Sequence, residues 1–85
     1  MTGDTMSTNI KVEFTIEPFV DGVVPAYVQA AVDALRGMGL DPEVGPFGTS
    51  FETGPDRIGQ AVAAIMERAY SNGATYVSID SGPAE

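Results

Sequence analysis

Apolar and polar residues alternate strictly from position 10 to position 17 of the chain. This period of two is typical of a strand that buries one face. Pro18 cannot donate a ladder hydrogen bond, so we expect the strand to end there, and Asp21-Gly22 predicts a turn. The apolar set is Ile10, Val12, Phe14 and Ile16, and the polar set is Lys11, Glu13, Thr15 and Glu17.

Two later stretches carry apolar residues at helical spacing. The first predicted helix begins near Pro25, which suits a first turn, and ends around Gly37 to Gly39. The second follows Thr53-Gly54-Pro55-Asp56, where a capping residue, a proline and an acid favour a helix start, and Asn72-Gly73 ends it. The apolar stripes are Val24, Tyr27, Val28, Ala31, Val32 and Leu35 in the first helix, and Ile58, Ala61, Val62, Ile65, Met66 and Ala69 in the second.

Three shorter segments predict the remaining strands. Glu43–Pro46 and Thr49–Thr53 are separated by a tight reversal, and the glycines at positions 45 and 48 predict a bulge or kink there. Thr75–Asp80 alternates again, with Val77 and Ile79 as the inward pair. We expect residues 1–9 to form a disordered tail and residues 81–85 a short C-terminal tail.

The resulting order β-α-β-β-α-β predicts an α+β, ferredoxin-like sandwich spanning residues 10–80. Its antiparallel four-stranded sheet has the order 4-1-3-2, with both helices on one face. A chain of 85 residues leaves no room for a second core, so we expect a single domain. The uncovered face of the sheet is predicted to carry Lys11, Glu13, Thr15, Glu17, Ser50, Glu52, Tyr76, Ser78 and Asp80.

Composition narrows the function. Twelve acids against four bases give a net charge of −8, which disfavours nucleic acid and anionic membranes as partners. The chain has no cysteine, so it lacks a thiolate nucleophile and a thiolate metal site. It has no histidine either, so it lacks the usual general base near neutral pH and the commonest metal ligand. We therefore expect a binding protein rather than an enzyme, with no metal site. The polar N-terminal stretch is unlike a signal peptide, and a cytoplasmic location is expected.

Strand polarity predicts a group of polar and aromatic residues at one end of the uncovered face. Thr15 and Glu17 are expected beside the turn at residues 47–50 on one side and beside Tyr76 on the other. A carboxylate, hydroxyls and aromatic rings could hold a flat cationic heterocycle through stacking and charge pairing. The alternative is a solvated sheet face whose aromatic rings serve only packing.

The segment Glu43-Val44-Gly45-Pro46-Phe47-Gly48-Thr49, with Glu52 just beyond it, resembles the thiamine-binding protein family. Glu17-Pro18 at the end of the first strand and Asn72-Gly73-Ala74 at the helix exit are similar too. The resemblance implies a ferredoxin-like fold that self-associates through its sheets, as a dimer or tetramer. It also implies binding of thiamine or its hydroxymethylpyrimidine moiety without a reaction or a catalytic cofactor. The positions it implies nearest the ligand are Phe47, Gly48, Thr49 and Glu52.

The candidate ligand-binding set combines both arguments: Thr15, Glu17, Phe47, Gly48, Thr49, Ser50, Glu52, Tyr76 and Ser78. Thr49 shares its strand face with Phe51, so it reaches the uncovered face only across a bulge, and otherwise Ser50 takes that role. The acidic chain suits a thiazolium cation, and the scarcity of bases disfavours the pyrophosphate form. A structural or regulatory module whose sheet only assembles subunits is the alternative function.

Overall fold

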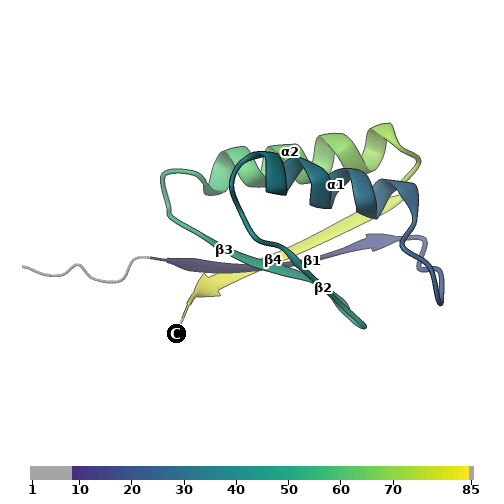
Figure 1. Ribbon diagram of the computed structural model, residues 1–85, viewed down its shortest axis with the longest axis horizontal. Coiled ribbons are helices and arrows are strands. Elements are labelled where there is room, and N and C mark those ends of the chain that lie inside the picture. Colours follow the sequence, from purple (N-terminus) through teal and green to yellow (C-terminus); the bar gives the residue numbers. More distant parts are fainter. Residues whose placement is uncertain (1–8, 85) are drawn as a thin grey trace, which may run out of the picture.

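The computed structural model describes residues 9–84, which form a four-stranded antiparallel sheet with two helices on one face (Figure 1). The sheet order β2-β3-β1-β4 confirms the predicted 4-1-3-2 topology and the ferredoxin-like α+β class. The elements are β1 (Ile10–Glu17), α1 (Ala26–Gly37), β2 (Glu43–Gly45), β3 (Gly48–Thr53), α2 (Ile58–Ser71) and β4 (Tyr76–Pro83).

The core lies between the sheet and the helices. Alternate residues of β1 face the helices, as the period of two predicts, and Phe14 meets Phe51 of β3 edge-on with ring centroids 6.2 Å apart. The helices contribute Leu35 and Ile65, both fully buried. Met66, which was expected in the apolar stripe of α2, is exposed instead.

The pairing of β1 with β3 advances one residue at a time from Ile10↔Thr53 to Phe14↔Thr49. The expected bulge is therefore absent from these pairs. Gly45 pairs with Gly48, so only Pro46 and Phe47 make the reversal between β2 and β3. The flexibility of the glycines is used at the ends of the hairpin loop rather than for an extra residue in the ladder.

Two boundaries differ from the sequence prediction. β4 continues to Pro83, because the full length of β1 offers it a partner down to Ile10↔Pro83; residues 81–83 were expected to be tail. α2 begins at Ile58, and the preceding residues form a turn in which Arg57 N donates to the Gly54 carbonyl at 3.1 Å. Residues 1–8, most of the predicted N-terminal tail, lie outside the described residues. Within the described part of the chain, no helix is long and apolar enough to cross a membrane.

Candidate functional site

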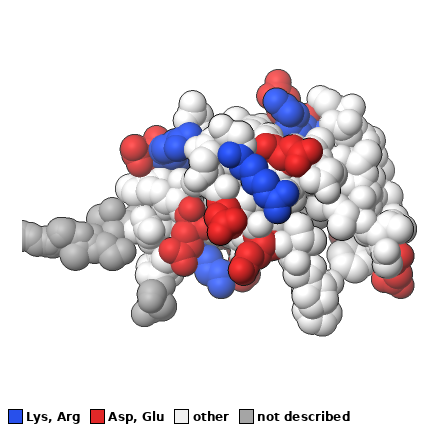
Figure 2. All heavy atoms as spheres, viewed as in Figure 1, with Lys and Arg blue, Asp and Glu red and all other residues white. Residues whose placement is uncertain are grey.

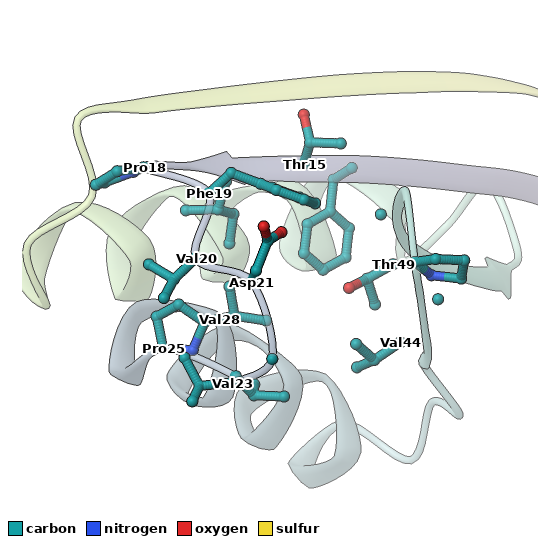
Figure 3. A pocket seen from close by; sticks show the side chains of 17 residues that line it. Thr15, Pro18, Phe19, Val20, Asp21, Val23, Pro25, Val28, Val44 and Thr49 are labelled. Atoms are coloured by element: carbon teal, nitrogen blue, oxygen red, sulfur yellow. The ribbon is translucent and has the colours of Figure 1, made fainter.

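A pocket of about 470 Å³ lies on the helix side of the sheet, between the β1–α1 loop (residues 18–25) and the β2–β3 hairpin (Figure 3). This volume is in the range of small-molecule sites, roughly 300–1,000 Å³. Phe14 and Ile16 of β1 and Val28 of α1 line its inner side. The pocket exists because α1 begins only at Ala26, which leaves this end of the sheet to the loop and the hairpin.

The β1–α1 loop forms one wall and is held at both ends. The Tyr27 hydroxyl donates to the Pro18 carbonyl, and the Pro25 carbonyl accepts the N–H groups of the first turn of α1. Between these anchors, Phe19 is 63% exposed and Val23 is 61% exposed, although both line the pocket. Large apolar side chains on a solvent-facing loop are typical of a surface that binds something.

The hairpin forms the facing wall, mostly with backbone. Gly48 has a φ of +153°, and a Cβ atom there would lie 3.0 Å from the Phe14 carbonyl oxygen and 3.1 Å from Thr15 Cγ2. Only glycine accepts this backbone conformation together with so close an approach to β1. Position 48 of the family-like segment is therefore glycine for a packing reason.

Thr49 is the main polar group of the helix-side pocket. The residue is only 4% exposed, and no hydrogen bond to its hydroxyl is found among residues 9–84. Its oxygen borders the pocket and is not sealed in the core, since Thr53 Oγ1 is the buried side-chain atom without a partner in this part of the chain. Figure 3 shows the hydroxyl oxygen directed into the pocket, toward the side of the loop. A ligand group that pairs with this hydroxyl would add a hydrogen bond, worth roughly 0.5–1.5 kcal/mol.

Asp21 supplies the charge of this pocket. Of the described residues that line it, Asp21 is the one that is ionic, and its side chain lies on the loop side in Figure 3. In Figure 2 the Lys and Arg side chains lie over the helices and the left part of the molecule, away from the loop and hairpin that project at the right. No group of three acidic residues that could hold a metal ion is found within residues 9–84. The pocket therefore combines apolar walls, one hydroxyl and one carboxylate.

A second hollow of about 350 Å³ lies behind the same hairpin, on the uncovered face. It is more polar, with Glu13 and Asp80 as its carboxylates. Six of the nine sequence-predicted site residues line it: Thr15, Phe47, Gly48, Thr49, Ser50 and Ser78. Three of these, Thr15, Gly48 and Thr49, also line the helix-side pocket.

The other three predicted site residues line neither hollow. Glu17 and Tyr76 pair with each other at the far end of β1, as strand polarity predicted, and Glu52 pairs with Lys11 further back along β3. Phe47, at the hairpin tip, is 88% exposed. The structure therefore separates the predicted set into residues around the hairpin and residues distant from it.

Sequence analysis missed the β1–α1 loop as a pocket wall. The available signal was the run Phe19-Val20-Asp21-Gly22-Val23-Val24, four large apolar residues around one acid between a strand and a helix. We interpreted Asp21-Gly22 only as a turn. Apolar residues in a connection that is too short to have a core of its own indicate a surface that packs on a ligand or a partner.

Comparison with known proteins supports the family that residues 43–49 resemble. The search of curated proteins gives no match. Among solved structures, a Streptococcus pneumoniae protein is similar at 18% identity and a TM-score of 0.71, over 91% of this chain and 88% of that one. A Thermotoga maritima protein described as a candidate for thiamine biosynthesis or salvage is 20% identical, with a TM-score of 0.67 over 91% and 84% of the two chains. The domain of unknown function DUF77 from Bacillus cereus is 21% identical, with a TM-score of 0.65 over 98% and 81%.

These identities show a shared fold and nothing more specific. The sequence model of the family described as thiamine-binding protein, by contrast, matches residues 5–81, nearly the whole chain. The resemblance seen at residues 43–49 is confirmed by this match, which supports a thiamine-related role and a small heterocyclic ligand. The chain belongs to the thiamine-binding protein family.

Proposed function

We propose that this protein binds thiamine or its hydroxymethylpyrimidine moiety in the helix-side pocket, without catalysing a reaction. Family membership supports the class of ligand, and the pocket supports the place. The observation that carries the proposal is the Thr49 hydroxyl, which makes no hydrogen bond within residues 9–84 and is directed into a largely apolar pocket of ligand size.

The chemistry of the pocket suits both parts of thiamine. The apolar walls, including Phe14, Phe19 and Val28, can contact the faces of the flat pyrimidine ring. The Thr49 hydroxyl can donate to a ring nitrogen or accept from the exocyclic amine. The Asp21 carboxylate can offset the positive charge of the thiazolium ring. The neutral pyrimidine alcohol would use the first two contacts and not the third.

We favour the helix-side pocket over the hollow on the uncovered face. The uncovered hollow is more polar, and Phe47 at its rim is almost fully exposed, so it buries little apolar surface of a ligand. In this proposal Thr49 faces the ligand and Ser50 does not. Thr15 and Gly48 shape the wall between the two hollows, and the remaining sequence-predicted residues lie outside the ligand contact.

The test is titration calorimetry with thiamine and with the pyrimidine alcohol. Thr49→Val should weaken both ligands by about tenfold, the size of one lost hydrogen bond. Ser50→Ala removes the neighbouring hydroxyl on the opposite face and should leave both affinities unchanged. If Ser50→Ala weakens binding and Thr49→Val does not, the ligand binds on the uncovered face instead. If neither thiamine nor the pyrimidine alcohol gives binding heat at millimolar concentration, the proposed function is contradicted.

A structural role in self-assembly is the second candidate. Both helices lie on one face of the sheet, and nothing within residues 9–84 covers the other face (Figure 1). The outer edge of β4 is also unpaired in the described part of the chain, and unpaired strand edges favour association. Light scattering at micromolar concentration tests this role, and a monomer would contradict it.

A further inference from the structure

We infer that the pocket discriminates by phosphorylation state, with Asp21 as the specificity-determining residue: it accepts thiamine and the pyrimidine alcohol and rejects thiamine monophosphate and diphosphate. This inference rests on the proposed function. It concerns which chemical form of the ligand the protein holds, a question that the family description leaves open.

The charges around the pocket carry the argument. Phosphate sites in proteins rely on Arg or Lys side chains or on N–H groups at a helix start. None of the four basic residues of the chain lines the pocket. Lys11 lies on the uncovered face, 3.7 Å from a Glu13 carboxylate oxygen, and Arg57 donates to the Met38 carbonyl at 2.9 Å. Arg36 lies in the last turn of α1, whereas the pocket adjoins its first turn.

The start of α1 does not replace the missing cations. Pro25, which lines the pocket, has no N–H group. Val28, the other lining residue of this turn, donates its N–H to the Pro25 carbonyl at 3.0 Å. Ala26 and Tyr27 are not among the lining residues. The pocket therefore offers a phosphate group no donor from the helix terminus.

Asp21 makes the pocket unfavourable for phosphate, because its carboxylate repels another negatively charged group. A phosphoryl group held inside this pocket of about 470 Å³ would lie near Asp21, its one ionic lining residue among those that the structure describes. Asp21 is exposed, and in water the repulsion between its carboxylate and the roughly two negative charges of a phosphoryl group about 4 Å away corresponds to about a tenfold loss of affinity. Thiamine and its phosphate esters carry the same thiazolium cation, so the attraction of this cation to Asp21 cancels in their comparison and the repulsion of the phosphoryl group makes the difference. The net charge of −8 acts in the same direction.

The experiment is calorimetry with four probes: thiamine, the pyrimidine alcohol, thiamine monophosphate and thiamine diphosphate. The full chain should bind thiamine about tenfold more tightly than thiamine monophosphate. Asp21→Asn should reduce the ratio of the affinities for thiamine and thiamine monophosphate, and Asp21→Lys should make the monophosphate the tighter ligand. Asp80→Asn removes the same unit of charge from the uncovered face and should leave the ratio unchanged. Thermal melting confirms that each variant is folded.

The outcomes separate this inference from the proposed function. Equal binding of thiamine and thiamine monophosphate overturns the inference and leaves the proposed function standing. If Asp80→Asn reduces the affinity ratio as much as Asp21→Asn does, net charge causes the discrimination and the role of Asp21 is overturned. Failure of thiamine and of the pyrimidine alcohol to bind contradicts the proposed function itself.

Discussion

Phe14 of β1 and Thr49 of β3 are directly opposed in the sheet, and both side chains are buried on its helix-covered face. The hydroxyl of Thr49 therefore lies beside the aromatic part of the core, where Phe14 also meets Phe51. Thr49 thus lies on the core side of the sheet and directs its oxygen into the pocket (Figure 3). Removal of the Thr49 oxygen should therefore weaken ligand binding without weakening the fold.

Thr49→Val tests this expectation. Valine has nearly the same shape, and the Thr49 hydroxyl makes no hydrogen bond within residues 9–84 and borders the pocket, so we expect the free energy of unfolding to change by less than about 1 kcal/mol. Ligand affinity should fall in the same variant, as argued above. Denaturant unfolding measures the first quantity. A loss of stability above about 1 kcal/mol would show that the hydroxyl has a structural partner.

Thr53 offers a matched case without a pocket. Its Oγ1 atom is buried and has no hydrogen-bond partner among the described residues, and Thr53 lines neither hollow. Thr53→Val should raise the free energy of unfolding by about 1 kcal/mol, because it removes an unsatisfied polar atom and keeps the volume. Thr53→Ser keeps the hydroxyl and loses the methyl group, and it should be less stable than the wild type. Stability of Thr53→Val equal to or below that of the wild type would mean that a bound water satisfies the hydroxyl.

Gly48→Ala should destabilise the fold. The added Cβ atom meets the Phe14 carbonyl oxygen at 3.0 Å, and the φ of +153° is strained for any residue with a side chain, so the expected cost is about 1–3 kcal/mol. Gly59 in α2 has nothing within 4 Å of an added Cβ. Gly59→Ala should therefore stabilise by about 0.5–1 kcal/mol. Thermal melting of both variants checks the contrast, and similar shifts would contradict the close approach at the hairpin.

The two phenylalanines around the hairpin should behave in opposite ways. Phe51 is buried against Phe14, and Phe51→Ala should cost about 3–5 kcal/mol of stability. Phe47 is 88% exposed, so Phe47→Ala should change stability by less than about 0.5 kcal/mol. Calorimetry on the stable variant then shows whether the hairpin tip contacts the ligand. A large loss of stability in Phe47→Ala would mean that another surface covers this ring.

The strand pattern was sufficient to predict the sheet. The alternation from Ile10 to Glu17 identified which side chains of β1 face the helices, and parity along β3 placed Thr49 with Phe51. Side chains in a strand alternate regardless of tertiary context, so register and face follow once the strand order is known. The prediction that Ser50 takes the uncovered face in the absence of a bulge is confirmed by its pairing with Glu13.

The pocket could not be predicted in the same way. Its wall of Phe19, Val20 and Val23 lies in a connection with no period, and the path of such a loop depends on where its ends are held. One of those anchors, the contact between the Tyr27 hydroxyl and the Pro18 carbonyl, joins residues nine positions apart and has no sequence signature. The predicted site therefore lay on the uncovered face, because the helix-covered face was expected to be filled by core residues.

The two walls of the pocket differ in how far their side chains can be exchanged. On the hairpin, Gly45, Pro46 and Gly48 line the pocket together with Val44 and Thr49, and any added bulk at Gly48 would collide with the neighbouring strand. On the loop, exposed side chains make the surface, and exchanging them disturbs few other contacts. Redesign toward a different vitamin or drug-like heterocycle should therefore randomise positions 19–23 and leave positions 45–48 untouched.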